Sequence, residues 1–407
     1  MNNELKKFLA NGYTPYQSTA LAAQMLEKSG FTKTDVFSSL ENGDKLYKSE
    51  DGALIAVSVG SPTGFMIVGS HTDSPALKLK RGLLSGGRLN VEVYGGAINY
   101  TLFDTPLKIC GRIYVDDGKK IAAKNVVSDY RVTIPSLAVH LNRGVNGGFA
   151  PSAQNDLAPL IGEHPDFLEK LAGKDKPVDY DLYACPDVDP YECGADGEYL
   201  CSPRIDNLVS VFSSVKAIAA AKPVGINICV CFDGEETGSR IRRGAAAAFF
   251  PKLLEEIFFA AGGKNFAQAL RNSFMLSADN AHATHPAHPE KSDPVNKVEL
   301  GGGIVIKHHP NYATDGLGAA TAKKIFSDAG VPYQDFYSNS DAPCGSTIGL
   351  ITAAASDIRT CDIGVPQLAM HSAVETCKAS DIDAMTKGLT AFFSSSVRFN
   401  GDGAKIS

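Results

Sequence analysis

Histidine and carboxylate side chains follow several apolar segments of the chain. They are His71 and Asp73 in GSHTDSP, Asp206 in CSPRIDNL, Asp233, Glu235 and Glu236 in CFDGEETGS, Asp279, His282 and His285 in LSADNAHATHP, and His371 in LAMHSAVET. Taken singly, such a residue is more often a helix cap or a hydrogen-bonded turn residue than a ligand. Together they supply the imidazole and carboxylate donors that zinc, cobalt and manganese bind. The combination predicts a metal site.

Several carboxylates in one site indicate two divalent cations. Two close cations repel each other, so their site needs a carboxylate that bridges them. Two histidines and three carboxylates would give each cation one imidazole, one terminal carboxylate and a share of the bridge. A water bound between two metals loses its proton near neutral pH and attacks a polarised carbonyl. A further carboxylate, which does not bind metal, must carry the proton to the leaving amine.

The adjacent Glu235 and Glu236 fit this division of roles. Neighbouring side chains of an extended chain point in opposite directions, so one can bind a metal while the other faces the bound water. The alternative is a solvated acidic loop. Similarly, His71 can bind a metal through one ring nitrogen while Asp73 holds the other N–H. The alternative for this pair is a turn with a capping Asp.

Apolar segments typical of buried strands precede these polar residues. They are Ala53–Val59, Phe65–Gly69, Ile226–Phe232, Phe274–Ser277 and Ile304–Lys307. Residues 1–30 indicate a pair of surface helices, and further helical patterns occur at Asn207–Ala221, Ala245–Ala261, Leu317–Ala329 and Ala379–Val397. This alternation predicts an α/β fold in which helices cover both faces of a mixed β-sheet. Ligand sites in such sheets lie at the carboxyl ends of strands, where these polar residues fall.

Residues 76–200 have a different pattern. Segments such as GGRLNVEVYGG, PLKICGRIYVDD and YRVTIPSLAVHL are typical of β-hairpins with Gly and Asp-Gly turns. The segment Asp187–Glu198 is expected to return the chain. We therefore predict a discontinuous catalytic domain, residues 1–75 and 201–407, with residues 76–200 inserted as a β-rich domain.

The composition is that of an ordinary globular protein and excludes several classes. The chain has 407 residues, 44% hydrophobic and 21% charged, and its 39 basic and 45 acidic residues give a net charge of −6. Because no block of Lys and Arg occurs, we expect no nucleic-acid partner. The nine cysteines form no CxxC pair, and no apolar stretch indicates a signal peptide or a membrane span. We expect a cytoplasmic protein.

The motifs together resemble those of the aspartyl aminopeptidases, co-catalytic two-metal exopeptidases related to the wider zinc aminopeptidases. The resemblance covers nearly the whole chain, in the family's order: GSHTDSP near Ser70, IPSLAVHLNRGVN at Ile134–Asn146, SPRIDNL at Ser202–Leu208, DGEETGS at Asp233–Ser239, SADNAHATHP at Ser277–Pro286, SDAPCGSTIG at Ser340–Gly349 and DIGVPQLAMHS at Asp362–Ser372. It implies a zinc-peptidase-like fold and a metalloaminopeptidase that removes N-terminal residues, preferably Asp or Glu, from peptides through a water bound by two metals.

The resemblance also implies which residues bind the metals. His71, Asp206 and Asp279 would bind one ion, and Asp206, Glu236 and His371 the other, with Asp206 as the bridge. Each subunit would hold two divalent ions, zinc in the first place, with cobalt or manganese as alternatives. Proteins of this family form tetrahedral assemblies of twelve subunits, so a homo-oligomer built from dimers is expected.

Five more residues receive roles around the metals. Glu235 matches the general base, and Asp73 matches the acid that orients the first histidine. Lys307 matches a lysine near the substrate's acidic side chain. His140 matches a histidine that the dimerisation domain, residues 76–200, presents to a neighbouring active site. For His282 three roles stay open: supporting the metal ligands, shaping the substrate pocket or joining a subunit contact.

The chain departs from the family's pattern at three places. It reads HHPNYAT at His308–Thr314 without the family's Arg, LFDTPL at Leu102–Leu107 in place of WFDRDL, and HSAVE with Val374 in place of Arg. All five implied ligands are present, so these changes bear on the substrate and leave the reaction type unchanged. An aminopeptidase of broad or neutral preference is the alternative, and a catalytically silent assembly protein on the same fold is a third hypothesis.

Overall fold

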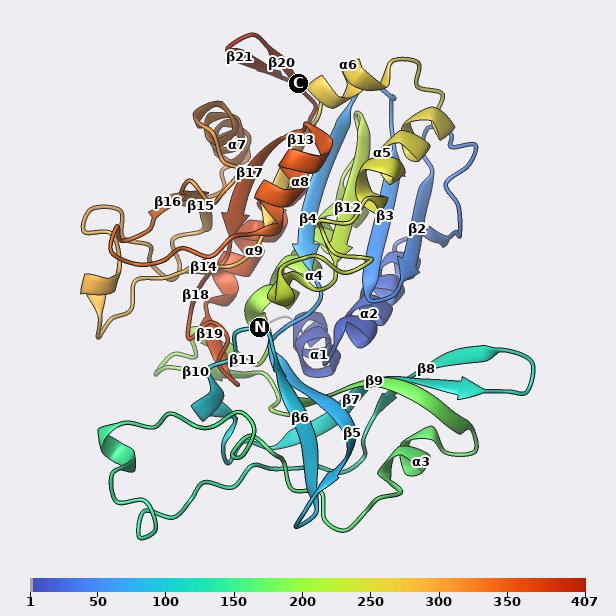
Figure 1. The fold of residues 1–407 in the computed structure, drawn as a ribbon. Coiled ribbons are helices and arrows are strands. Elements are labelled where there is room, and N and C mark those ends of the chain that lie inside the picture. The colour runs from blue at the N-terminus through green and yellow to red at the C-terminus, as the bar shows by residue number, and fades with distance from the viewer. Residues whose placement is uncertain (1–2) are drawn as a thin grey trace.

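A nine-stranded mixed sheet forms the centre of the computed structural model, which describes residues 3–407 (Figure 1). β12 pairs antiparallel with β3 and parallel with β4, and β13 is parallel to β4 and β17. In order across the sheet, the strands are β1 (Thr32–Lys33), β2 (Lys45–Glu50), β3 (Ala53–Val59), β12 (Ile226–Phe232), β4 (Phe65–His71), β13 (Phe274–Ala278), β17 (Arg359–Gly364), β15 (Ile304–His308) and β16 (Tyr333–Tyr337).

Helices cover both faces of this sheet, as the sequence predicts. Alternate residues of β3 point to two apolar cores, Leu54 and Ala56 to one and Ile55 and Val57 to the other. The first core lies under α1 (Asn3–Asn11), α2 (Pro15–Lys28), α4 (Ile205–Ala220), α7 (Gly316–Asp328) and α9 (Ala379–Phe393). The second lies under α5 (Phe249–Ala260), α6 (Phe266–Arg271) and α8 (Ile348–Ser356).

The predicted strands are present, with small differences at their ends. β3 and β12 have the predicted bounds. β4, β13 and β15 each extend by one or two residues beyond their predicted ends, and β4 and β15 thereby include His71 and His308. Because His71 belongs to β4 itself, the sheet positions its side chain directly.

The predicted helices differ more. The helix expected over Ala245–Ala261 begins only at Phe249, and the one expected over Ala379–Val397 ends at Phe393. After it the chain forms a hairpin, with β20 (Val397–Asn400) paired to β21 (Gly403–Ile406). Residues 394–397 leave the predicted helix and lead into this hairpin, which places the ring of Phe399 5.6 Å from that of Phe274. A long-range apolar contact of the hairpin competes here with the local helical pattern.

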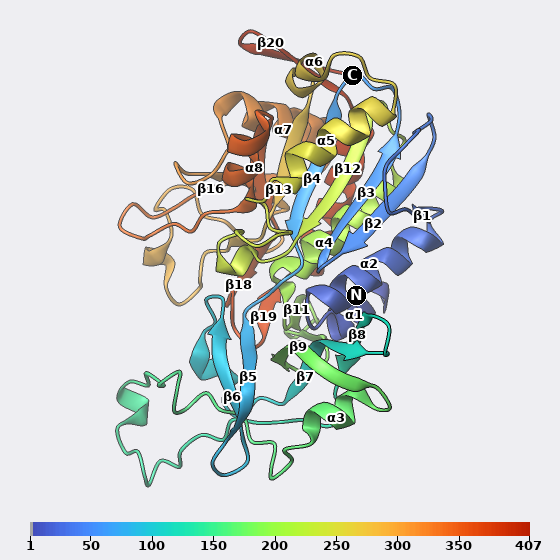
Figure 2. The same ribbon diagram turned by 45° about the vertical axis from the view of Figure 1, so that its right-hand side comes forward.

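A second, antiparallel sheet lies between residues 76 and 186. Its five strands, in order, are β6 (Arg88–Tyr94), β5 (Ala76–Leu84), β9 (Lys176–Pro186), β7 (Leu107–Asp116) and β8 (Ile121–Val127). Figure 2 shows this sheet below the main one, with α3 (Phe167–Ala172) beside β8 and β9. It has an apolar core of its own, as an inserted domain requires. The domain division at residues 76 and 200 stays a prediction.

The segment Tyr130–Leu141 forms no hairpin, although one was expected there. Single bridges occur at Val132, Thr133 and Ile134, and the segment 135–156 that follows contains only the short 3₁₀ turn η2 (Val145–Gly147). Four large apolar side chains of the segment are exposed: Leu137, Val139, Leu141 and Phe149. The hairpin prediction is wrong here because the subunit does not bury these side chains, and burial is what stabilises a hairpin.

A third, five-stranded sheet joins residues 191–202 to the later part of the sequence. Its strands, in order, are β10 (Tyr191–Cys193), β11 (Tyr199–Ser202), β19 (Glu375–Cys377), β18 (Pro366–Leu368) and β14 (Ala281–His282). Short 3₁₀ turns complete the structure: η1 (Asn99–Leu102), η3 (Glu235–Thr237) and η4 (Pro289–Lys291). The pairing of β11 with β19 brings the start of α4 close to the loop that carries His371.

The helices of residues 3–407 include none with the length and apolar composition needed to cross a membrane. All nine cysteines are free thiols, and seven of them are buried. Buried thiols of this kind pack as small apolar side chains. The cytoplasmic location stays a prediction.

Candidate active site

The five implied metal ligands converge at one edge of the main sheet. His71 is the last residue of β4, Asp279 directly follows β13, and Glu236 lies in η3 after β12. Because β4, β12 and β13 are parallel, their carboxyl ends meet at the same edge. Asp206 enters from the first turn of α4, and His371 from the loop between β18 and β19.

We call these five side chains the metal cluster. Their donor atoms are spaced like the ligands around tetrahedral metals. Nε2 of His71 lies 3.4 Å from Oδ1 of Asp206 and 3.4 Å from Oδ1 of Asp279. Nε2 of His371 lies 3.4 Å from Oδ2 of Asp206 and 3.4 Å from Oε1 of Glu236. These separations are long for hydrogen bonds, but tetrahedral donors about 2.0–2.1 Å from zinc lie about 3.3–3.4 Å apart. Asp206 offers one oxygen to each group, as a bridging ligand does.

Main-chain carbonyl groups orient both imidazoles. Nδ1 of His71 lies 3.0 Å from the carbonyl oxygen of Asp73, and Nδ1 of His371 lies 3.1 Å from that of Gly96. A proton on each Nδ1 leaves Nε2 free to bind a metal. The Asp73 carboxylate, expected to hold His71, is farther from Nδ1, with Oδ1 at 3.4 Å.

The charges of the metal cluster shift its pKa values strongly. Burial alone would lower the pKa of His71, but Asp206 and Asp279 raise it well above its usual value. Burial also opposes protonation of His371, yet Asp206 and Glu236 raise its pKa to about 10. Burial, followed by the Asp206 charge, raises the pKa of Glu236 well above its usual value. The same negative charges attract a divalent cation, whose binding would release these protons.

Two buried carboxylate oxygens lack a hydrogen-bond donor among residues 3–407, Oδ1 of Asp206 and Oε1 of Glu236. Leaving such an oxygen unpaired costs about 1–3 kcal/mol or more. Each faces an imidazole Nε2 at 3.4 Å, across a gap that suits a metal ion. The residues present therefore fit two divalent cations, with Asp206 shared between them.

The turn that carries Glu235 and Glu236 is not the extended chain that the sequence suggested. Residues 235–237 form the 3₁₀ turn η3, flanked by two glycines with positive φ. Successive side chains of a 3₁₀ helix are about 120° apart, so the two glutamates still point to different sides. The Asp73 carboxylate holds this turn, since its two oxygens accept the N–H groups of Glu235 and Glu236, each at 3.1 Å.

Glu375 is a site residue that the sequence analysis missed. Its side chain is 2% exposed, Oε2 accepts the N–H of Asp206 at 2.9 Å, and Oε1 accepts the N–H of His371 at 2.7 Å. One carboxylate therefore holds the main chain of two ligands that are distant in sequence. The φ of His371 is +68°, a left-handed conformation that a non-glycine residue keeps only when its surroundings hold it. The sequence feature that could have indicated Glu375 is its position four residues after His371, in HSAVE.

The end of β6, inside the insertion, also contacts the metal cluster. The hydroxyl of Tyr94 donates to Oδ2 of Asp73 at 2.8 Å. The carbonyl of Gly96 holds the His371 ring, and the carbonyl of His371 accepts the N–H of Ile98 at 2.9 Å. Residues 94–98 thus position groups on both sides of the metal cluster, a contact that no sequence periodicity reveals.

A cavity of about 310 Å³ opens beside the metal cluster. This volume is at the lower end of the range of about 300–1,000 Å³ for small-ligand pockets. The cavity is lined by Asp206, Glu235, Asp279, Asn280, Ala281, His282, Lys307, Tyr312, Phe336, Gly345, Ser346, Thr347, Met370 and His371. Glu235, three of the implied metal ligands and Lys307 therefore border one space.

Lys307 and His282 lie on the wall of this cavity. Lys307 is 3% exposed, and its Nζ donates to the carbonyl of Asn280 at 2.9 Å and lies 3.6 Å from Oδ2 of Asp279. Part of its charge is therefore balanced inside the protein. Partial desolvation, followed by the Lys307 charge, lowers the pKa of His282. His285 lies farther away, in an adjoining cavity of about 320 Å³.

His140 does not reach the metal cluster of its own subunit. It lies exposed in a turn of the segment 135–156 and does not line the cavity. Its presentation to a neighbouring subunit stays a prediction.

A mixed α/β sheet that gathers imidazoles and carboxylates beside a half-buried glutamate, Glu235, is the architecture of a metal-dependent hydrolase. Residues 8–393 match the family described as "Aminopeptidase I zinc metalloprotease (M18)". The chain belongs to the M18 family and is a metalloaminopeptidase.

Curated bacterial relatives of the same family match over nearly their whole length. A protein named "Probable M18 family aminopeptidase 2" from Clostridium acetobutylicum is 36% identical over an alignment of 431 positions, which covers 97% of this chain and 100% of the relative. A protein of the same name from Pseudomonas aeruginosa is 37% identical over 429 positions, which cover 97% of this chain and 98% of the relative. These names specify the family and the activity without a preferred residue.

Solved structures confirm the predicted fold class. A chain in the cryo-EM structure of the Ape4 and Nbr1 complex has a TM-score of 0.91 and 31% identity, over 96% of this chain and 84% of that chain. The S. cerevisiae mApe1 dodecamer has a TM-score of 0.83 and 25% identity, over 96% and 95%. An M18 aminopeptidase from Thermotoga maritima has a TM-score of 0.84 over 95% and 94%, and its 23% identity bears on the fold alone.

Proposed function

We propose that this aminopeptidase removes single N-terminal residues from peptides, prefers Asp or Glu, and uses two divalent ions per subunit. The observation that carries the proposal is the spacing of the five donors, with Glu235 and Lys307 on the wall of the adjoining cavity. A cavity with room for about one amino-acid residue suits an exopeptidase better than an endopeptidase.

His71, Asp206 and Asp279 would hold one ion, and Asp206, Glu236 and His371 the other, with zinc ahead of cobalt or manganese. Such ions, when bound, polarise the scissile carbonyl and lower the pKa of water. The chain's own residues orient the donors, hold the peptide and move the proton.

Glu235 acts as the general base in this proposal. It accepts a proton from the attacking water and delivers it to the leaving amine. Burial raises the pKa of Glu235 to about 8, and Asp279 and Asp73 add to the rise against the effect of His71. Asp73 keeps Glu235 in place by accepting its N–H.

Lys307 supports the preference for acidic residues, because a buried ammonium group attracts a carboxylate that enters the cavity. One observation favours the alternative, an aminopeptidase of broad or neutral preference. Oδ2 of Asp279 lies 3.6 Å from Nζ of Lys307 and already balances part of its charge. If the enzyme prefers acidic residues, loss of Lys307 should abolish that preference. If its preference is broad or neutral, loss of Lys307 should leave substrate choice unchanged.

Subunit association is part of the proposal. The exposed Leu137, Val139 and Leu141 flank His140, and clustered exposed apolar side chains commonly mark protein interfaces. The S. cerevisiae relative is solved as a dodecamer. We expect dimers formed through residues 76–200 to assemble into a tetrahedral dodecamer, in which His140 reaches a neighbouring cavity.

A panel of aminoacyl substrates tests the function. Zinc-loaded protein should hydrolyse Asp and Glu derivatives with a higher kcat/KM than Ala, Leu or Lys derivatives, and a chelator should abolish every activity. Lys307→Met should lower kcat/KM for Asp and Glu by at least about tenfold and leave Leu hydrolysis nearly unchanged. The exposed Lys324 of α7 supplies the control variant, Lys324→Met.

Zinc content is measured on each variant, because Lys307 lies close to a metal ligand. Equal kcat/KM values for acidic and neutral substrates in the wild type would establish the alternative function. An acidic preference that survives Lys307→Met would show that Lys307 does not determine the preference for acidic residues.

A further inference from the structure

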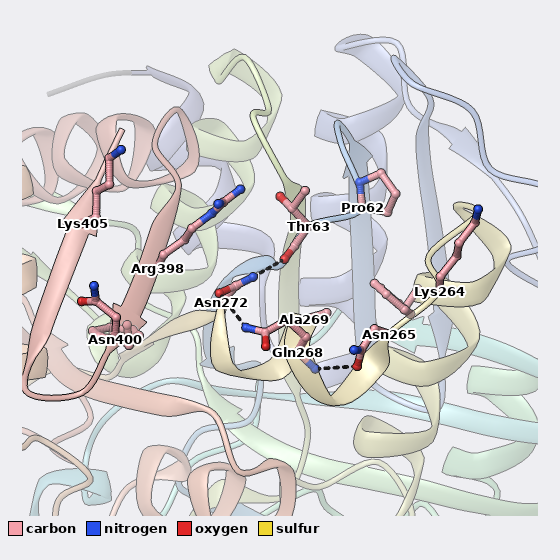
Figure 3. Close-up of a pocket in the computed structure, with 12 residues that line it drawn as sticks. Pro62, Thr63, Lys264, Asn265, Gln268, Ala269, Asn272, Arg398, Asn400 and Lys405 are labelled. Atoms are coloured by element: carbon pink, nitrogen blue, oxygen red, sulfur yellow. Dashed lines mark hydrogen bonds between the residues drawn. The ribbon is translucent and has the colours of Figure 1, made fainter.

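A second cavity lies at the opposite end of the main sheet from the metal cluster. It has a volume of about 600 Å³ and borders Pro62 and Thr63, just before β4 (Figure 3). His71 ends the same strand, so about 20 Å of strand separates the two sites, at about 3.3 Å per residue. The walls come from the turn before β4, from α6 with its preceding loop, and from the β20–β21 hairpin.

Close main-chain contacts and hydrogen bonds hold the shape of this cavity. A Cβ atom at Gly263 would lie 2.4 Å from the ring of Phe258, and one at Gly64 would lie 2.2 Å from the carbonyl oxygen of Asn272. Nδ2 of Asn272 donates to the carbonyl of Thr63 at 3.1 Å, and its Oδ1 accepts from Nε2 of Gln268 at 3.3 Å. The floor is therefore formed before any ligand binds.

Cationic side chains stand on both walls. Figure 3 shows Arg398 and Lys405 on the hairpin side and Lys264 on the opposite side, with amide side chains between them. None of the lining residues is acidic, and no ion pair within residues 3–407 includes these three cations. The chain as a whole has a net charge of −6, so the overall composition does not explain an acid-free cationic cavity. Like charges gathered in this way repel unless an anion lies among them.

The donors match phosphate groups in kind. An Arg fork and Lys ammonium groups, here all exposed to solvent, are the usual partners of phosphate oxygens, and the amides of Asn265 and Asn400 offer further N–H groups. A cavity of about 600 Å³ has room for linked phosphates, which carry charge to both walls. We propose that this cavity binds a ligand with a chain of two or more linked phosphate groups, at a site independent of the metals.

Such a ligand would connect the C-terminal hairpin to the main body of the protein. Arg398 and Lys405 belong to β20 and β21, while Lys264 follows α5. Binding should therefore raise the melting temperature of the protein, since a ligand that binds only the folded state stabilises it.

Isothermal titration calorimetry on the zinc-loaded full chain tests the proposal. Inorganic tripolyphosphate and ATP are titrated separately, with potassium chloride keeping the ionic strength constant. Two pocket variants are compared. The first combines Arg398→Gln with Lys405→Gln, and the second, Lys264→Gln, removes the cation of the other wall. The control is Lys33→Gln with Lys119→Gln, the same change of charge at exposed lysines outside the cavity.

Both pocket variants should bind tripolyphosphate at least about tenfold more weakly than the control and the wild type. Zinc content is measured after each titration, because tripolyphosphate also binds free zinc. ATP binding as tight as that of tripolyphosphate shows that the phosphate chain suffices, and tighter binding shows that a nucleoside adds contacts. Equal affinity in pocket and control variants, or no binding at matched ionic strength, would overturn the proposal.

Discussion

The metal cluster and the segment 135–156 differ in what holds their side chains. In the metal cluster, His71, Asp73 and Asp206 are 1%, 0% and 3% exposed, and hydrogen bonds from the same chain orient them. In the segment, Leu141 is 74% exposed and Leu137 is 57% exposed, in a region without helix or strand except the short turn η2. The metal cluster is ordered by contacts within one subunit. The segment 135–156 presents apolar side chains that only another surface can bury.

This difference separates two requirements for activity. The donors for metals and proton transfer are arranged within one subunit, so metal binding should not depend on assembly. We expect the apolar segment around His140 to act between subunits, so assembly should respond to changes there without loss of metal. The first three of the following variants each affect one of these two regions.

Glu235→Gln should have the largest effect. The amide keeps the size of the side chain but cannot accept the proton, so kcat should fall by about 10²–10⁴-fold. The zinc content should remain that of the wild type, because Glu235 is not among the proposed ligands. Steady-state kinetics and elemental analysis measure the two quantities, with Glu255→Gln on the exposed face of α5 as the control. Activity above a tenth of the wild type would show that another group moves the proton.

Glu375→Ala should weaken zinc binding by about 10–100-fold, the usual effect of removing a group that orients metal ligands. Glu375→Gln should have an intermediate effect, because the amide keeps one acceptor for the two N–H groups and replaces the other with a donor. Competition with a chromogenic chelator measures the affinity. An unchanged zinc affinity in Glu375→Ala would mean that the metal cluster does not need this support.

Val139→Asp with Leu141→Asp should weaken subunit association at least about tenfold, since charges replace apolar contacts at an interface core. Light scattering after gel filtration measures the assembly, and zinc content should not change. Val295→Asp is the control, because Val295 is 83% exposed but lies outside the insertion. If Val295→Asp dissociates the assembly and the segment variant does not, the segment 135–156 does not hold the subunits together.

The smallest effect is expected at Glu50. Arg243, against the opposing effect of burial, lowers the pKa of Glu50 from 4.5 to about 2, with help from Arg242. A carboxylate with a lowered pKa stabilises the fold above its unfolded pKa, and this contribution is lost as the pH falls from about 4.5 toward about 2. Because the side chain is 30% exposed, Glu50→Gln should lower the free energy of unfolding at pH 7 by about 1 kcal/mol or less.

Urea unfolding at pH 7 and at lower pH measures this contribution, with the exposed Glu41→Gln as the control. The difference between wild type and variant should shrink as the pH falls below 4.5. A difference that stays constant down to pH 3 would show that the ion pairs with the arginines do not cause it.

The sequence predicted well the features that depend on local pattern. The apolar runs of β3 and β12 define these strands to the residue, because strands buried on both faces need continuous apolar side chains. It predicted poorly the features that depend on distant contacts. Residues 394–397 leave the predicted helix and lead into the hairpin whose Phe399 contacts Phe274, and residues 135–141 leave the hairpin pattern because the subunit does not cover them.

Residue types and their order along the chain determined the class of chemistry, because imidazoles and carboxylates after buried strands indicate a metal site before any coordinates exist. Only the tertiary structure decided how these groups are held: the Asp73 carboxylate under the Glu235 turn, the carbonyl of Gly96 on His371, and Glu375 between two ligands. Such contacts join residues far apart in sequence, and they depend on how whole strands and loops pack, which local spacing does not encode.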